Sequence, residues 1–219
     1  MVRLAEIWRY PVKSMAGERL GSAELRADGI EGDRVAQVWD ERGRILTART
    51  RPALLRHRGT ILADGSPGVD GLPWADPEVT RRIEAAAGRG ARLRLFDGEE
   101  RFDVLPLLVA TDGALAAFGR DPRRLRPNLV VAGAEGLVER EWEGLAIRVG
   151  RAVVGLADLR GRCVMTTWDP DTQKQDPGVL RDIARRFDGR LCLNATVLEP
   201  ARIEAGDEVE LLGRWEPDR

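Results

Sequence analysis

The chain has 219 residues, of which 43% are hydrophobic and 32% are charged, so its composition is that of a globular protein and excludes general disorder. Its 35 basic and 36 acidic side chains nearly cancel, so no overall field favours nucleic acid as a partner. No stretch approaches the roughly 20 consecutive apolar residues of a membrane-spanning helix, and a cytoplasmic protein without a membrane segment is expected. Cys163 and Cys192, the two cysteines, are too few for a disulfide framework or an iron–sulfur cluster.

The first part of the chain is predicted to form short, antiparallel strands separated by turns. Alternating apolar side chains predict strands at residues 3–10, 20–26, 35–40 and 45–49. Residues 64–75 carry three glycines and two prolines and are predicted to form a loop.

Three helices are predicted. The first starts with Asp76 as N-cap and Pro77 at the first helical position, and it ends at Gly88. Shorter helices are expected at residues 112–118 and 178–187. Apolar side chains at helical spacing mark the buried faces of the first and third helices: Val79, Ile83 and Ala86, and then Val179, Leu180, Ile183 and Phe187.

The remaining segments are again predicted to be strands: residues 92–96, 101–105, 129–132, 145–149, 152–156, 191–198 and 208–212. Strands and helices do not alternate regularly, and no glycine-rich phosphate-binding turn follows a strand, so a doubly wound nucleotide-binding fold is excluded. The expected fold is α+β: mainly β, a β-barrel with peripheral helices.

Cys163 is the strongest candidate for chemistry. Arg160 and Arg162 flank it, Thr166 and Thr167 follow, and residues 169–172 form a tight Asp-Pro-Asp-Thr turn. Two guanidinium groups favour the thiolate, which attacks electrophiles and ligates soft metals. A buried, inert cysteine is the alternative, and that is the expected state of Cys192, which lies between two leucines.

Several turns place a cation beside a hydroxyl, carboxylate or amide group, a combination that can hold an anion. Each has a structural alternative, such as a solvated turn or a salt bridge. These candidates are Lys13 and Ser14, Asp33 and Arg34, Thr47 and Arg49, and Arg126 and Asn128.

The helix predicted at residue 112 offers a weaker candidate. Thr111 or Asp112 fits a helix N-cap, and free amides there could also bind an oxyanion. The only histidine, His57, stands between two arginines and is interpreted as a surface residue. Serine–histidine–acid catalysis is therefore disfavoured.

In their order and spacing, these segments resemble the MOSC family, the domains related to the C-terminal part of molybdenum cofactor sulfurase, and in particular its amidoxime-reducing branch. The resemblance implies an abbreviated N-terminal β-barrel-like region at residues 1–100 and a MOSC domain at residues 101–219, the two intertwined. It rests on residues 10–14, 32–34, 46–49, 126–131, 141–142, 162–172 and 205–209.

The resemblance also implies a molybdenum–pterin cofactor with Cys163 as catalytic residue and metal ligand, which suits a soft sulfur donor. The implied activity is reduction of small N-hydroxylated or N-oxygenated compounds, with electrons from a separate flavin or iron–sulfur reductase. The residues implied to hold the cofactor are Lys13, Ser14, Arg34, Arg49, Thr111, Asp112, Arg126, Asn128, Arg162 and Thr166.

Two other functions remain open. Cys163 could carry a persulfide, or hold the cofactor for delivery, in a sulfur-carrier or cofactor-carrier protein. Alternatively, the chain is a binding module without turnover.

Overall fold

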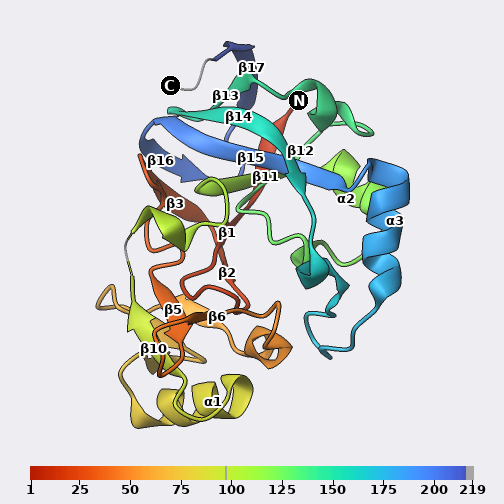
Figure 1. Ribbon diagram of the computed structural model, residues 1–219. Helices are drawn as coiled ribbons and strands as arrows, with labels where there is room; N and C mark the ends of the chain where they lie inside the picture. The colour runs from red at the N-terminus through yellow and green to blue at the C-terminus, as the bar shows by residue number, and fades with distance from the viewer. Residues whose placement is uncertain (97, 216–219) are drawn as a thin grey trace.

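A computed structural model describes residues 1–96 and 98–215. Within those ranges the strands form one eight-stranded sheet, in the order β17-β13-β14-β15-β11-β12-β1-β2, in the upper part of Figure 1. Neighbouring strands are antiparallel except β11 and β12, which are parallel. The strands are β1 (Arg3–Arg9), β2 (Glu18–Leu20), β11 (Leu107–Thr111), β12 (Leu129–Ala132), β13 (Leu145–Val149), β14 (Ala152–Gly161), β15 (Arg190–Glu199) and β17 (Val209–Arg214).

Three small sheets complete the described strands. They are β10-β5-β6, formed by Arg92–Leu95, Ala36–Trp39 and Ile45–Leu46; β16-β3-β4, formed by Ala201–Glu204, Ser22–Arg26 and Gly29–Ile30; and β7-β8-β9, formed by Gly59–Ile61, Pro67–Val69 and Leu72–Pro73. Because β3 pairs with β16 and β1 with β12, segments from both ends of the chain share sheets. The prediction of a mainly β fold with peripheral helices is confirmed.

The described residues form three α-helices, α1 (Pro77–Ala87), α2 (Asp112–Phe118) and α3 (Pro177–Phe187), as predicted. The carboxylate of Asp76 accepts a hydrogen bond from the Glu78 amide at 2.7 Å, and Gly88 follows the helix with φ 110°. Short 3-10 helices lie at Pro52–Arg56 (η1), Glu99–Arg101 (η2), Pro122–Arg124 (η3), Val138–Glu141 (η4) and Val164–Thr167 (η5).

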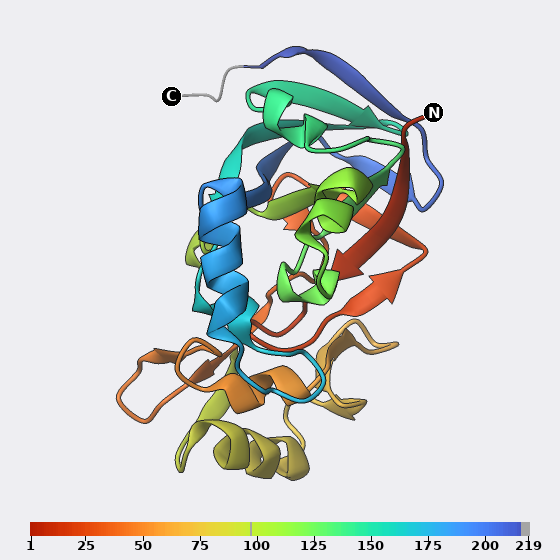
Figure 2. The same cartoon turned by 90° about the vertical axis from the view of Figure 1, so that its right-hand side faces the viewer.

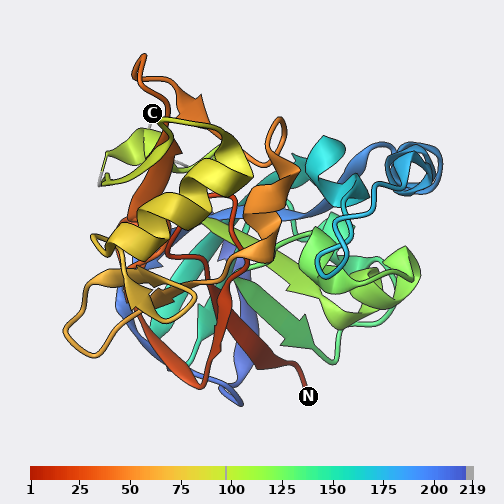
Figure 3. The same cartoon turned by 90° about the horizontal axis from the view of Figure 1, so that it is seen from below.

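Alternating side chains of the large sheet divide the core. On β11, Leu107 and Val109 face a cluster that includes β3 and β16, whereas Leu108 and Ala110 face α2 and α3. A third cluster packs α1 and η1 against β5 and β10 at the lower end (Figures 1 and 2). Figure 3 shows α1 lying beside η1 across that end.

Two predictions need correction. The strand expected at residues 101–105 is wrong: η2 ends at Arg101, and β11 starts only at Leu107, after Pro106, which has no amide donor for a ladder. The loop expected at residues 64–75 contains the hairpin of β8 and β9, in which Val69 pairs with Leu72. Its turn residues, Asp70 and Gly71, have φ 53° and 82°, as a two-residue Asp-Gly hairpin requires.

Candidate active site

A cavity of about 370 Å³ brings together most of the predicted site residues. The residues that line it come from the segment after β1, the turn before β5, the segment after β6, the stretch from η2 into β11, the approach to β12, and the end of β14 with the residues that follow it. The predicted residues among them are Lys13, Ser14, Arg34, Arg49, Arg126, Asn128, Arg162 and Cys163.

Three lining residues adopt left-handed backbone conformations, which side chains other than glycine rarely do. Ser14, Arg34 and Arg126 have φ of 71°, 54° and 59°. Such strain persists only where surrounding contacts impose it, and it concentrates at ligand-binding sites. The Arg34 amide donates to the Tyr10 carbonyl at 2.9 Å, and the Lys13 amide donates to the Ala36 carbonyl at 2.9 Å, so backbone bonds hold this wall.

Tyr10 supports two of the cavity's cations. The guanidinium of Arg126 lies 4.2 Å from the centre of its ring, and that of Arg34 lies 5.3 Å away. The Tyr10 hydroxyl donates to the Pro127 carbonyl at 3.1 Å, and burial raises the pKa of Tyr10 to about 12. Burial also lowers the pKa of Arg126 to about 10, with the Arg34 charge contributing in the same direction. The sequence prediction missed Tyr10 as a support.

Asn128 lines the cavity, but its amide is already engaged. Its Nδ2 donates to the Trp8 carbonyl at 3.1 Å and to the Asp33 carboxylate at 3.2 Å, and its Oδ1 accepts from the Leu108 amide at 3.2 Å. The fully buried Asp33 also pairs with Arg34 and accepts from the Tyr10 amide at 2.6 Å. Asn128 and Asp33 therefore fix the positions of the cationic side chains around them.

Asp103 is a lining residue that the sequence prediction did not include. Its carboxylate lies 3.0 Å from Lys13 Nζ, 2.8 Å from Arg49 and 3.5 Å from Arg160. Although burial opposes ionisation, Lys13, Arg49 and Arg160 together lower the pKa of Asp103. Asp103 is thus ionised at neutral pH.

Cys163 follows β14 and is partly exposed at the cavity, unlike Cys192, which is fully buried. Burial opposes the charge of Arg49, yet Asp103 and the adjacent Cys163 thiol raise the pKa of Arg49. Arg162 donates from Nη2 to the Leu125 carbonyl at 2.6 Å, and its buried Nε has no partner among the described residues. Burial raises the pKa of Cys192 to about 12, so Cys192 is not available as a thiolate ligand.

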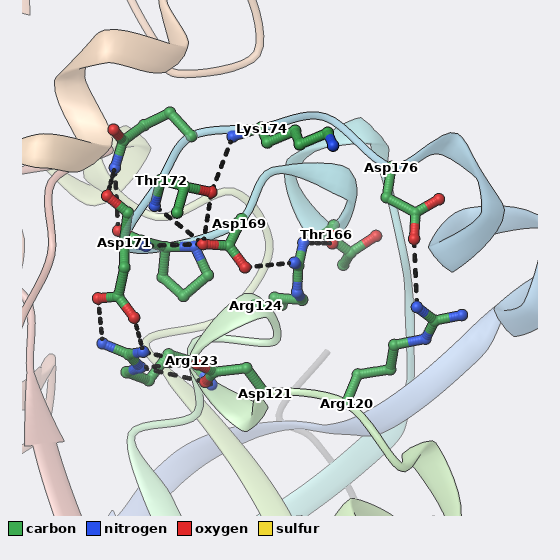
Figure 4. A network of polar contacts seen from close by, with 12 residues as sticks. Arg120, Asp121, Arg123, Arg124, Thr166, Asp169, Asp171, Thr172, Lys174 and Asp176 are labelled. Carbon is green, nitrogen blue, oxygen red and sulfur yellow. Dashed lines mark hydrogen bonds and ion pairs between the residues drawn. The ribbon is translucent and has the colours of Figure 1, made fainter.

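The segment after Cys163 is tied to η3 by the ion pairs in Figure 4. Arg124 donates to the Asp169 carboxylate at 2.8 Å and to the Thr166 carbonyl at 3.2 Å. Arg123 contacts Asp171 at 2.6 Å and 2.9 Å. The Asp169 side chain also accepts from the Thr172 amide at 2.9 Å, as expected of a tight Asx turn. This network fixes the segment of residues 163–172, here called the cysteine loop, against η3.

Three predicted site residues lie outside the cavity. Thr111 caps α2 by accepting from the Ala114 amide at 3.1 Å, and Asp112 accepts from the amides of Gly133 and Ala134 at 2.7 Å and 3.1 Å. The Thr166 hydroxyl donates to the Cys163 carbonyl at 2.9 Å. These three side chains bind backbone groups and so stabilise local structure. They do not line the cavity.

The end of β14 supplies two lining residues, Asp158 and Arg160, that were not among the predicted cofactor-binding residues. Asp158, Arg160 and Arg162 alternate along the chain and share one face. Arg160 donates to the Asn194 side chain at 3.1 Å, and Asn194 donates to Asp158 at 3.0 Å. Asn194 is a polar residue within the mostly apolar segment 191–197, and this pattern could have identified it as a site residue.

The donor set of the cavity fits an anionic ligand that brings its own metal. Seven cationic side chains and two carboxylates are among the described lining residues. Nowhere in residues 1–96 and 98–215 do three or more His, Cys, Asp or Glu side chains gather into a metal-binding group. The single thiol of Cys163 can therefore complete the coordination of a metal held mainly by another molecule, but cannot hold an ion by itself.

Comparison with known families decides the classification. The profile of the MOSC N-terminal beta barrel domain matches residues 1–86, and that of the MOSC domain matches residues 112–210. The chain belongs to the MOSC family. Both the recognition from the sequence and the β-barrel-like fold are thereby confirmed, and membership associates the chain with the molybdenum cofactor.

Curated MOSC relatives include human proteins. Mitochondrial amidoxime reducing component 2 of Homo sapiens is 28% identical over 86% of this chain and 72% of its own length. Mitochondrial amidoxime-reducing component 1 of Homo sapiens is 24% identical over 96% of this chain and 83% of its own length. Among solved structures, the YUAD protein from Bacillus subtilis matches with a TM-score of 0.54 at 15% identity, covering 99% of this chain and 98% of its own, so it shares the MOSC fold.

The described helices of this MOSC protein are short. α1 and α3 have 11 residues each, and no helix in the described part of the chain has the length and apolar character needed to cross a bilayer.

Proposed function

We propose that this MOSC protein binds a molybdenum–pterin cofactor in the cavity, with Cys163 as the protein's ligand to the metal, and reduces N-hydroxylated compounds. One observation carries the proposal: the partly exposed thiol opens into a cavity walled by cations from the distant segments of Lys13, Arg34 and Arg126. The similarity to proteins named amidoxime-reducing components indicates the substrate class.

The chain's own residues have separate tasks in this proposal. Lys13, Ser14, Arg34 and Arg126 hold the cofactor's phosphate and pterin, because ammonium, hydroxyl and guanidinium groups are the donors that such an anion takes. Arg49 and Arg162 add positive charge beside the thiol. When bound, the cofactor supplies a redox metal that can accept an oxygen atom.

The overall reaction consumes two electrons and two protons, breaks the N–O bond, and releases the reduced amine or amidine together with water. Cys192 is buried and far from an ionised state, so no second thiol is available to store electrons beside Cys163. In this proposal, a separate flavin or iron–sulfur reductase supplies the two electrons. Because Asp103 is ionised, it is not the proton donor.

The test is cofactor content and turnover after expression in a host that makes the cofactor. Purified protein is expected to contain about one molybdenum and one pterin per chain, and to reduce an aromatic amidoxime with a chemical electron donor. Cys163→Ser should abolish turnover and reduce retained molybdenum more than retained pterin. Protein that carries neither molybdenum nor pterin would overturn the proposal.

The carrier alternative uses the same thiol but predicts a different mass for the purified protein. A labile extra sulfur on Cys163, detected by mass spectrometry of freshly purified protein, together with no amidoxime turnover, would favour a sulfur or cofactor carrier. For a binding module, Cys163→Ala would leave cofactor retention unchanged.

A further inference from the structure

A second cavity, of about 650 Å³, lies beside the cysteine cavity. The two share Arg124, Arg126 and Met165 as lining residues, so those side chains form the partition between them. The second cavity also contacts η1 and the turn at residues 169–172. Its volume is in the range of sites for small organic ligands, roughly 300–1,000 Å³.

Aromatic side chains give this cavity flat apolar surfaces. The partly exposed Trp8 and Trp168 rings contribute to its lining, together with the apolar Leu55 and Met165, whereas the Tyr10 ring is already covered by Arg34 and Arg126. Such rings stack on planar ligands, as they do on the bases of single-stranded nucleic acids.

The charges of the second cavity select an anion. Arg56, Arg58 and Arg123 line it together with the two shared arginines, against the single carboxylate of Asp171. Arg123 is paired with Asp121 and Asp171, and Arg124 is paired with Asp169, so Arg56, Arg58 and Arg126 supply the remaining positive charge. Arg56 donates to the Gln173 side chain at 2.6 Å, whereas the exposed Arg58 guanidinium makes no ion pair with any residue in 1–96 or 98–215. A cationic ligand is therefore repelled, and a phosphate is attracted.

We infer that the second cavity binds a nucleoside monophosphate, with the base against the aromatic side chains and the phosphate on the arginines. The same chemistry has two sources. One is a free nucleotide; the other is the nucleotide part of a pterin dinucleotide whose pterin end lies in the cysteine cavity, and this second source rests on the proposed function. In either case Arg124 and Arg126 couple the two sites.

The test uses cofactor-free full-length protein titrated with CMP and GMP, followed by tryptophan fluorescence and calorimetry. Saturable binding with quenching is expected, and inorganic phosphate or guanosine alone should bind much more weakly. Arg58→Ala should weaken nucleotide binding about tenfold, because a charged hydrogen bond is lost. Arg185→Ala, an exposed arginine on α3 outside both cavities, is the matched control and should bind normally.

A second measurement separates the two sources. The loaded protein is first denatured without hydrolysis, and free nucleotide is separated from the pterin. Acid hydrolysis of the pterin fraction should then release one nucleotide per pterin if the source is a dinucleotide, and none if the nucleotide binds free. The inference is overturned if neither nucleotide binds the cofactor-free protein and none is released from the loaded protein, or if Arg58→Ala binds as the control does. Nucleotide binding by the cofactor-free protein does not require Cys163. The Cys163→Ser protein should therefore still bind nucleotide, even if the proposed function fails.

Discussion

The Nζ of Lys13 lies 3.0 Å from the carboxylate of Asp103, a residue far along the chain. Arg49 contacts the same carboxylate at 2.8 Å. Asp103 therefore places one negative charge among cations that would otherwise repel one another, and it competes with an incoming anion for those cations.

Replacement of this carboxylate should destabilise the empty protein. Asp103→Asn is expected to lower the free energy of unfolding at pH 7 by about 1 kcal/mol, a modest value because the Asp103 side chain is 36% exposed. The folded-state pKa lies below the ordinary 3.8, so the stabilisation is present above that pH and is lost as the pH falls below it. Urea unfolding of both proteins from pH 7 downward measures the difference.

Inorganic phosphate provides the complementary measurement. It should raise the melting temperature of Asp103→Asn more than that of the unmodified protein, because the freed cations bind the anion and binding stabilises the folded state. Asp64→Asn, on an exposed turn away from the cavity, is the control. An equal phosphate effect on all three proteins would show that Asp103 does not screen the site.

Tyr10 is the only tyrosine in the chain, so its ionisation can be followed directly by ultraviolet absorbance. Burial raises its pKa from 10.0 to about 12, and folded protein should show no tyrosinate until the pH approaches 12. The chain unfolded in urea should titrate near the ordinary value. A folded-state titration near pH 10 would contradict the buried position of Tyr10 between Arg34 and Arg126.

The same shift predicts that Tyr10 stabilises the fold less at alkaline pH. Above pH 10.0 the unfolded chain loses the tyrosine proton while the folded protein keeps it, so the Tyr10 contribution to stability falls as the pH rises toward 12. Arg126 contributes with the opposite sign over this range, because burial lowers its folded-state pKa to about 10, so the Tyr10 contribution is measured as a difference between two proteins. The difference between a pKa of 10.0 and one of about 12 corresponds to about 2–3 kcal/mol of unfolding free energy. Tyr10→Phe removes this pH dependence but also the hydrogen bond to Pro127. Its unfolding free energy should therefore be lower than that of the unmodified protein at pH 8, and the difference between the two proteins should shrink as the pH rises from 10 to 12.

Arg124 should hold the cysteine loop. Its side chain is 9% exposed, and Arg124→Ala breaks the contacts with Asp169 and the Thr166 carbonyl, so a loss of about 2 kcal/mol is expected. Alkylation of Cys163 should become faster as the loop loosens. Arg123→Ala, which removes a 44% exposed side chain, should cost less than about 1 kcal/mol. Equal effects of the two substitutions would argue against the positioning role.

The two thiols should differ sharply in reactivity. Iodoacetamide should label Cys163 in the folded, cofactor-free protein and reach Cys192 only after unfolding, because Cys192 is 0% exposed and its pKa is raised to about 12. Peptide mass spectrometry gives both rates, and Cys192→Ala should leave the rate at Cys163 unchanged. Rapid labelling of Cys192 in folded protein would place it near the surface.

Local signals predicted those parts of the fold that depend on neighbouring residues. The cap at Asp76, the proline after it and the glycine at 88 fix α1 without reference to the rest of the chain. The strand predicted at residues 152–156 continues to Gly161 through register shifts opposite β15, which no local pattern shows. Because the predicted strand stopped at residue 156, Asp158 was missed.

The site could be predicted only where a motif brings its chemistry along the sequence. Lys13 with Ser14, and Arg162 with Cys163, are such motifs, and both reach the cavity. Asp103 lies in a segment that was wrongly predicted to be a strand, and its importance comes entirely from contacts with distant residues. Thr111 is the opposite case, because its role as N-cap of α2 was predicted correctly but its role at the cavity was not. Its hydroxyl group donates to Glu139, away from the cavity.

The pairing of β3 with β16 has a consequence for biosynthesis. The residues that line the cavity run from Lys13 to Asn194, and β3, which pairs with β4 on one edge, obtains its partner on the other edge only when Ala201 has been synthesised. A ribosome exposes the N-terminal cations long before the strands that complete their enclosure. Any ligand of this cavity therefore enters a fully synthesised, folded chain, and its supply must be matched to finished protein rather than to translation.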